Sequence, residues 1–469
     1  MASNSQVLTK KQNTSYVILI AVAAALGGFL FGFDTAVING AVGALSKAFN
    51  IDSFMTGFAV SSALLASAAG AWIAGPIADR QGRIKTMVAA SILFTLSAIG
   101  SGAPFGIWDF IFWRSVGGVA VGMASVIAPA YIAEVAPAHL RGRLGSLQQL
   151  AIVVGIFIAL LCNYFIASGA GSAEAPFWFG VTAWRWMFWA EVPPAVLYGL
   201  AALKIPESPR YLIAQQRYEE AGVVLKKVLG GDVEAKIDEI RQTVMTERKP
   251  KFSDLFSRSG GLLPIVWIGM GLSILQQFVG INVIFYYSSV LWQAVGFSEK
   301  DSLLITVITG VVNILTTLIA IAYVDKFGRK PLLALGSIGM TVTLGTLTVI
   351  FGGATVDAVT GTPTLSGTSG IIALVAANLY VVFFGFSWGP IVWVMLGEMF
   401  NNRIRAAALS LAAAVQWLAN FLISTTFPPL LKNFGLGSAY GLYTIASAIS
   451  IFFVILLIKE TKGKELEEM

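Results

Sequence analysis

The chain has 469 residues, of which 56% are hydrophobic and only 12% are charged. A soluble globular protein carries about 25% charged residues, so this composition excludes a soluble enzyme of ordinary type and indicates a protein of the lipid bilayer. The single Cys162 allows no intrachain disulfide, and one histidine cannot build a multi-histidine metal centre. We therefore expect no metal site and no cofactor.

Twelve apolar runs are long enough to cross a bilayer, since about 20 residues at 1.5 Å per residue span a hydrocarbon core of roughly 30 Å. They predict an all-α membrane protein with twelve transmembrane helices. The approximate ranges are 16–45, 54–78, 84–103, 107–134, 142–168, 184–205, 260–296, 302–324, 331–353, 370–399, 404–431 and 437–458.

Residues 206–259 interrupt this pattern, because charged residues are much denser there. The segments "YEEAGVVLKKVL" and "VEAKIDEIRQTV" within it carry apolar residues at helical spacing, which predicts short amphipathic helices. A flexible linker is the alternative. The charged segment divides the spans into two bundles of six, in 1–205 and 260–458, and a short tail follows at 459–469.

Basic residues gather in every second connection between spans, and the alternate connections hold few. Short basic loops remain on the cytoplasmic side, so both chain ends are expected in the cytoplasm and the protein in the inner (cytoplasmic) cell membrane. The basic connections and ends contain Lys10, Lys11, Arg80, Arg83, Lys85, Arg141, Arg143, Lys326, Arg329, Lys330, Arg403, Arg405, Lys459, Lys462 and Lys464.

The two halves repeat three landmarks in the same order. "GPIADRQGRIK" follows the second span and "AYVDKFGRKP" the eighth, "AEVAPAHLRGRL" follows the fourth and "GEMFNNRIRAAAL" the tenth, and "PESPR" and "KETKG" close the halves. In the middle landmark Glu134 precedes Arg141, and Glu398 precedes Arg405, by seven residues. Such internal duplication is typical of secondary transporters, which bind their substrate near the midplane between the repeats.

These landmarks, with "GFLFGFDTAVING", "QQFVGINVIFYYS" and "GPIVWVMLGEMF", resemble the sugar porter family of the major facilitator superfamily from end to end. "PESPR" with "QQ...GIN...YY" is specific to sugar porters, whereas the "D-R-x-G-R" turn marks only the superfamily. Within the family the nearest likeness is to bacterial, in particular cyanobacterial, glucose transporters. The resemblance implies uptake of a hexose, D-glucose first, by alternating access, with the hexose, a proton and the lipid bilayer as partners and no nucleic acid.

Three charged residues of the first half stand out because they lie deep inside their predicted spans and not near a span end: Asp34, Arg114 and Glu191. A charge at a helix centre costs roughly 2.5–3.5 kcal/mol, so such residues are functional candidates. Counted from the extracellular ends of their spans, Asp34 lies about 16 Å deep and the other two about 10 Å deep. All three therefore lie on the extracellular side of the centre, and we expect them to form one cluster. Proton symporters of the family resemble this chain in carrying an aspartate at the Asp34 position, which implies proton coupling. A permanent ion pair in a passive facilitator is the alternative.

A sugar needs many hydrogen-bond partners and a few flat apolar faces. Amides gather in several spans, and tryptophan offers an apolar face with one N–H donor. For any single amide, a role in holding helices together is the alternative. Animal facilitators carry a glutamate where this chain has Gly385, so their specificity is not assumed. The resemblance implies a sugar pocket lined by Gln149, Gln276, Gln277, Asn282, Asn313, Trp388, Trp393 and Gln416.

Two spans are expected to be broken. On a straight helix Gln277 and Asn282, five residues apart, would point about 140° from each other and could not face one small ligand. Gly280 between them, and the bend that family members have here, predict a discontinuous seventh span. In the tenth span the expected break is Gly389-Pro390.

Two groups of residues are predicted to gate the pathway. Tyr286 and Tyr287 in the seventh span are expected at an extracellular gate. Cytoplasmic acids and arginines repeat between the halves and suggest a network that closes this side in one state and separates in the other. Idle surface charges, worth about 0–1 kcal/mol a pair, are the alternative. The network comprises Arg83, Glu134, Arg141, Arg329, Glu398 and Arg405, flanked by Asp79, Glu207, Asp325 and Glu460.

Two other classes of protein compete with a transporter. A membrane-embedded enzyme would need a nucleophile with a base, a metal cluster or paired acids in one cavity, and none is evident. A non-transporting sugar receptor usually adds a long cytoplasmic tail, whereas only a few residues follow Gly463. We therefore expect a transporter and not an enzyme.

Overall fold

The computed structural model describes residues 14–230, 233–246, 252–257, 260–356, 363–365, 367–400 and 404–461. Ten helical stretches in these residues are long and apolar enough to cross a membrane. A further crossing is split into two short helices, α6 (Ala183–Trp189) and α7 (Val192–Lys204). The last two crossings share the label α17 (Arg405–Leu457), and they are two helical stretches separated by a kink at Gly435, which adopts a non-helical φ of 77°. The ten stretches, of which α17 supplies two crossings, and the split crossing together give the twelve predicted spans.

The membrane helices fall into two sets on either side of a charged segment. In the first set lie α1 (Thr14–Ala48), α2 (Ser53–Gln81), α3 (Arg83–Gly102), α4 (Ile107–Val135) and α5 (Ala138–Ala170), which pack with α6 and α7. In the second set lie α11 (Pro264–Phe278), α12 (Ile281–Gln293), α13 (Glu299–Phe327), α14 (Arg329–Gly352), α15 (Gly367–Gly385) and α16 (Trp388–Met399), which pack with α17.

The charged segment contains three short helices, α8 (Pro209–Ala214), α9 (Tyr218–Leu229) and α10 (Glu234–Thr246). The amphipathic helices predicted in 206–259 are confirmed as α9 and α10. Buried Val224 and Leu225 pack α9 against the first set, and Arg217 holds Glu220 through two side-chain hydrogen bonds of 2.7 and 2.6 Å. These bonds lower the pKa of the exposed Glu220.

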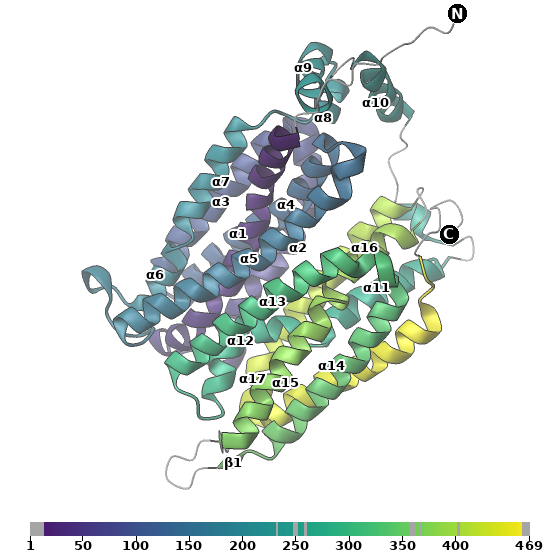
Figure 1. Cartoon of the computed structure of the whole chain (residues 1–469). Coiled ribbons are helices and arrows are strands. Elements are labelled where there is room, and N and C mark those ends of the chain that lie inside the picture. Colours follow the sequence, from purple (N-terminus) through teal and green to yellow (C-terminus); the bar gives the residue numbers. More distant parts are fainter. Residues whose placement is uncertain are drawn as a thin grey trace, which may run out of the picture.

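Figure 1 shows the two sets as neighbouring bundles, with α8–α10 at one end of the first set. We call this end of the molecule the linker end and the opposite end the far end. Hydrogen bonds between the sets lie toward the far end: Ser61 and Thr425 hydroxyls are 2.6 Å apart, and Ala173 N donates to Glu299 Oε1 at 2.8 Å. Gly57 lets α2 approach α17 there, since a Cβ on it would lie 2.2 Å from a backbone carbonyl oxygen of α17.

Small elements outside the spans were not foreseen from the sequence. Between α14 and α15, β1 (Thr355–Val356) pairs antiparallel with β2 (Pro363–Thr364), with Thr355 opposite Thr364. Two 3₁₀ turns occupy Trp178–Gly180 and Phe252–Leu255. None of these elements is long enough to supply a periodic pattern.

Both predicted breaks exist, but one lies elsewhere. The seventh span breaks at Gly280, which adopts a φ of 82° between α11 and α12, as predicted. The tenth span is broken between Gly385, the last residue of α15, and Trp388, the first of α16. Gly389-Pro390 is therefore inside α16 and the predicted position was wrong, because proline is tolerated in the first turn of a helix and does not interrupt it there.

Candidate functional site

Asp34 and Arg114 form a buried ion pair between α1 and α4. Arg114 Nη1 donates to Asp34 Oδ1 at 2.7 Å, and Nη2 donates to the backbone carbonyl of Asp34 at 3.0 Å. Both side chains are no more than 2% exposed. The predicted neighbourhood of these two residues is confirmed, and the second hydrogen bond fixes the guanidinium to the helix itself as well as to the carboxylate.

Glu191 completes the cluster from the junction of α6 and α7. It is 1% exposed and lies close enough to Asp34 and Arg114 to interact with both charges. Phe188, one turn earlier, places its ring 5.8 Å from the Arg114 guanidinium carbon. Neither Glu191 carboxyl oxygen, nor Asp34 Oδ2, nor Arg114 Nε has a hydrogen-bond partner in the described chain. The cluster thus has three buried carboxyl oxygens and one buried N–H group without a hydrogen bond in the described chain.

The break at Gly280 joins three amides into one chain. Asn282 Nδ2 donates to Gln277 Oε1 at 2.5 Å, and Gln277 Nε2 donates to Gln276 Oε1 at 3.2 Å. Gln276 Nε2 in turn donates to the Trp388 carbonyl at 2.8 Å. The two residues that a straight helix would point 140° apart therefore meet, and the start of α16 is tied to the same place.

The two tryptophans predicted for the pocket lie in different surroundings. Trp388 is fully buried, and its indole N–H donates to Ser337 Oγ at 2.9 Å and to the Leu333 carbonyl at 3.2 Å. Its donor is therefore occupied by α14 in this state. Trp393 is 43% exposed and does not join the amide chain. Five residues separate it from Trp388, so the two side chains point about 140° apart on α16.

The other predicted pocket residues come from α5, α13 and α17. Gln149 is half-buried, and Asn313 is 8% exposed. Gln416 Oε1 is buried without a hydrogen-bond partner in the described chain. A Cβ on Gly385 would lie 3.7 Å from Asn313 Oδ1 and 3.0 Å from a Thr316 methyl carbon. A side chain at position 385 would therefore reach the Asn313 amide, which locates the departure from animal facilitators beside a predicted sugar ligand.

Gln148, which the pocket prediction omitted, is the more buried of two adjacent glutamines. It is 7% exposed, and neither its amide oxygen nor its amide nitrogen has a partner in the described chain. It lies against Gly28 of α1, where a Cβ would come 2.7 Å from Gln148 Nε2. A buried and unpaired amide is a candidate ligand residue. The sequence signal was the pair of amides itself, which did not say which of the two is buried.

Contacts between α1 and α12 connect the ion pair with the amide chain. Asn39 Nδ2 donates to the Phe285 carbonyl at 2.9 Å, and Ser289 N and Oγ donate back to Asn39 Oδ1 and O. Tyr286 lies close enough to Asp34 and Arg114 to feel their charges. The segment that starts at the Gly280 break therefore touches α1 about one turn beyond Asp34.

The predicted gate tyrosines are both buried against α17. Tyr287 donates its hydroxyl hydrogen to the Ser424 carbonyl at 2.8 Å. Tyr286 accepts from Asn420 Nδ2 at 3.5 Å. Ser424 is next to Thr425, which contacts Ser61 of α2, and Tyr286 also lies near Asp34 of α1, so both tyrosines lie beside contacts between the two sets.

The charges of the predicted network form two clusters of the same geometry, one in each set. Arg83 binds Glu134 through two hydrogen bonds of 3.0 and 2.9 Å, and Arg329 binds Glu398 through two of 3.1 and 2.8 Å. Each pair is bidentate and partly buried, which distinguishes it from an idle surface pair.

A third acid caps the turn beside each pair. Glu207 accepts from the backbone N of Arg83 at 3.0 Å, and Glu460 accepts from the backbone N of Arg329 at 3.0 Å. Gly82 and Gly328, which directly precede Arg83 and Arg329, have φ values of 98° and 86°. A Cβ on Gly82 would lie 2.3 Å from Glu207 Oε2. Glycine is therefore required in both "D-R-x-G-R"-type turns, and the repeat seen in the sequence holds at the level of hydrogen bonds.

Of the two remaining arginines of the network, only Arg405 has a side chain that the structure describes, and this side chain binds a backbone carbonyl. Arg405 Nε donates to the Phe400 carbonyl at 3.1 Å, and its Nη2 is buried without a partner in the described chain. The side chains of Arg141 and Asp325 lie outside the described residues. Glu398 receives its second partner from Thr461, whose hydroxyl donates at 2.6 Å. The seven-residue spacing of Glu398 and Arg405 thus marks the turn and does not define an ion pair.

A family model described as "Sugar (and other) transporter" matches residues 20–469. The chain belongs to the sugar transporter family. The glucose transport protein of Synechocystis sp. is 73% identical over 458 residues, which are 97% of this chain and 97% of that protein. The D-xylose-proton symporter of Escherichia coli K12 is 38% identical and is matched over 98% of this chain and 96% of its own length.

The fold of this sugar transporter is also similar to a solved structure. The xylose transporter XylE from E. coli, in a partially occluded inward-open conformation, gives a TM-score of 0.82 at 36% identity over 96% of this chain and 100% of that chain. These matches confirm the predicted family, the all-helical major facilitator fold and the assignment as a transporter and not an enzyme.

Proposed function

We propose that this sugar transporter takes up a hexose, D-glucose first, together with one proton. The sugar class is supported by the family and by the amide chain at the Gly280 break, which offers donors and acceptors from the described residues Gln276, Gln277 and Asn282. Glucose as the sugar is supported by the relative from Synechocystis, whose name states glucose transport. Proton coupling is supported by the relatives named as proton symporters.

The observation that carries proton coupling is the composition of the buried cluster. Asp34 and Glu191 supply two acids and Arg114 one base, so the cluster has a net negative charge unless one proton is bound. A net charge in a buried site is strongly unfavourable, so a proton neutralises the cluster and its release needs another arrangement of the helices. The unpaired carboxyl oxygens are the sites that a proton can occupy. A permanent ion pair would need no second acid.

The route from proton to sugar runs through α1 and α12. A proton on Asp34 weakens its bond to Arg114 and frees α1 to shift. The shift reaches α12 through Asn39 and Phe285. The same helix carries Asn282, so the position of the amide chain depends on the state of the cluster. One proton that crosses 100 mV supplies about 2.3 kcal/mol, which sustains roughly a fortyfold sugar gradient.

Alternating access supplies the transport step. We place the linker end, both chain ends and the segment 206–259 in the cytoplasm, with 1–205 and 260–458 as the two bundles of a multi-pass inner-membrane protein. The contacts between the bundles then close the extracellular side. Tyr286 and Tyr287 form part of that closure. The pairs Arg83–Glu134 and Arg329–Glu398, each inside one bundle, have the geometry of an open cytoplasmic side.

The experiment is uptake of labelled D-glucose by cells that express the chain, in competition with galactose, xylose and fructose, with and without a protonophore. Accumulation above the external concentration that the protonophore abolishes supports proton symport. Uptake that only equilibrates, with or without the protonophore, supports the passive facilitator. Glucose uptake that a tenfold excess of another sugar suppresses more strongly than unlabelled glucose does would reassign the substrate.

A further inference from the structure

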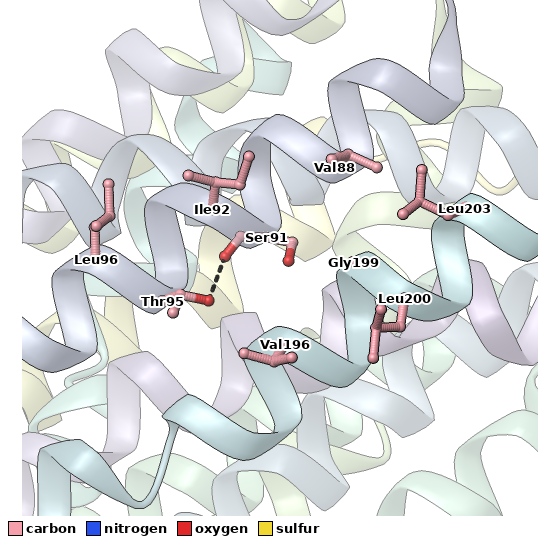
Figure 2. Close-up of a pocket in the computed structure, with 9 residues that line it drawn as sticks. All are labelled: Val88, Ser91, Ile92, Thr95, Leu96, Val196, Gly199, Leu200 and Leu203. Carbon is pink, nitrogen blue, oxygen red and sulfur yellow. Dashed lines mark hydrogen bonds between the residues drawn. The ribbon is translucent and has the colours of Figure 1, made fainter.

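A groove runs along the outer surface of the first bundle between α3 and α7, as Figure 2 shows. Its volume is about 280 Å³. Val88, Ile92 and Leu96 border it on α3, and Val196, Leu200 and Leu203 border it on α7. Five of these six side chains are 43% to 65% exposed, so the groove opens away from the protein core toward the surrounding lipid.

The floor of the groove offers no free polar group. A Cβ on Gly199 would lie 2.4 Å from Ser91 Oγ, so the groove is open at this level because residue 199 has no side chain. Ser91 Oγ donates to the Ala195 carbonyl at 2.8 Å, and Thr95 Oγ1 donates to the Ser91 carbonyl at 2.9 Å. Because both hydroxyls are satisfied, the hollow suits a flexible hydrocarbon chain. From Val88 to Leu96 it follows about 12 Å of helix axis.

Two lysines stand at one end of this hollow. Lys85 is three residues before Val88 and therefore on the same face of α3, and Lys204 is four residues after Leu200 on α7. The helices are antiparallel with Ser91 beside Ala195 and Gly199, so both lysines lie about 9–11 Å from Ser91 toward the linker end. In Figure 2, Val88 and Leu203 mark that end and Leu96 the other.

Both lysines are available to a ligand. Lys85 and Lys204 are exposed, and neither ammonium group has a hydrogen bond or an ion pair in the described chain. They differ in this from Arg83, which is held by Glu134. The groove therefore combines an apolar trough with two unpaired cations at its cytoplasmic mouth.

We propose that this groove binds an anionic phospholipid, with one acyl chain between α3 and α7 and the phosphate group between Lys85 and Lys204. The trough alone does not select a lipid, because a lipid tail is as apolar as the leucines that line it. Selection comes from the lysines, since each basic residue near the headgroup layer strengthens binding of an anionic lipid about fivefold. A zwitterionic lipid brings its own cation to the same place and loses this gain.

The test is native mass spectrometry of the full-length protein in detergent, titrated with phosphatidylglycerol or with phosphatidylcholine of the same chain length. The unaltered protein is expected to prefer phosphatidylglycerol, and K85Q/K204Q to weaken phosphatidylglycerol binding about 25-fold and to leave phosphatidylcholine unchanged. K226Q/K227Q, which removes two cations from α9, is the matched control and is expected to change neither affinity more than about twofold.

A second variant tests the trough separately. Val196→Phe fills the groove and keeps both lysines, and it is expected to weaken both lipids about tenfold. Free glycerol phosphate, which has the headgroup charge without a chain, is expected to compete only weakly. Equal affinity of the unaltered protein for the two lipids, or equal losses in K85Q/K204Q and K226Q/K227Q, would overturn the proposal. A dimer that Val196→Phe dissociates would overturn it in favour of a second copy of the chain.

Discussion

Asn282 donates its side-chain amide to Gln277 Oε1 at 2.5 Å, although the two residues belong to different helices of one span. Gly280 makes this bond possible, because its φ of 82° starts α12 in a new direction. The bond gives the proposed sugar site a continuous row of amides, and it ties that row to the helix that touches α1. Binding of sugar and movement of α12 are therefore connected at one residue.

Asn282→Ala is expected to raise the KM for glucose about tenfold. The substitution removes one donor and leaves Gln277 Oε1 buried without it, a loss of about 1–1.5 kcal/mol. Trp267→Ala is the control, because Trp267 is exposed on α11 and has no predicted role in the pocket. Initial rates of labelled glucose uptake measure both, and an increase in KM for Trp267→Ala that equals that of Asn282→Ala would contradict the described site.

Gly57→Val is expected to stop transport and to preserve glucose binding. A Cβ at this position would lie 2.2 Å from the Thr425 carbonyl oxygen, so α2 and α17 cannot close the far end. Gly75→Val on the same helix is a matched control, since no atom lies within 4 Å of its Cβ. Net uptake and counterflow in vesicles are expected to fall at least tenfold for Gly57→Val, while calorimetric binding of glucose persists. Normal counterflow by Gly57→Val would refute this account of the closure.

Glu398→Gln is expected to slow exchange and net uptake about tenfold. The substitution keeps the shape of the side chain but removes the charge that holds Arg329 through two hydrogen bonds. Glu134→Gln in the mirrored cluster is expected to have a similar effect, because Arg83 is held in the same way.

The control for these two variants is Glu220→Gln. Glu220 pairs with Arg217 on the exposed surface of α9, where an ion pair contributes about 0–1 kcal/mol. Its counterflow rate is expected to stay within about twofold of the unaltered protein. If Glu134→Gln and Glu398→Gln behave like this control, the two clusters serve only the structure of the turns.

Much of the fold could be predicted from the sequence, because length and hydropathy determine which segments cross a bilayer. The break at Gly280 could also be predicted, since one residue type and one spacing required it. The break before Trp388 could not, because Ser387 at the break has no sequence signal, whereas Gly389-Pro390 nearby has a strong one that a first helical turn tolerates. The last two spans, predicted as 404–431 and 437–458, are separated by the turn at Gly435 within α17, as their predicted ranges require.

The site could be predicted where a buried charge needs an opposite charge beside it. It could not be predicted where helix packing decides which of two similar neighbouring residues is buried. Asp34 and Arg114 had to meet, because isolated charges at that depth are unfavourable. Gln148 and Gln149 are alike in sequence, and only packing against Gly28 buries the first of them. The repeated spacing of Glu398 and Arg405 placed both in one network but did not say which arginine binds Glu398, and Arg329 takes both carboxyl oxygens. Spacing along one chain does not reveal contacts with another helix.

We propose above all that the buried cluster of Asp34, Arg114 and Glu191 binds and releases one proton for each sugar molecule that is transported. The most direct measurement is the pH of a lightly buffered, de-energised cell suspension when glucose is added. The unaltered protein is expected to make the medium more alkaline as glucose enters, and Asp34→Asn to equilibrate or exchange glucose without that change. Glucose entry without alkalinisation in the unaltered protein, or alkalinisation that persists in Asp34→Asn, would contradict the account.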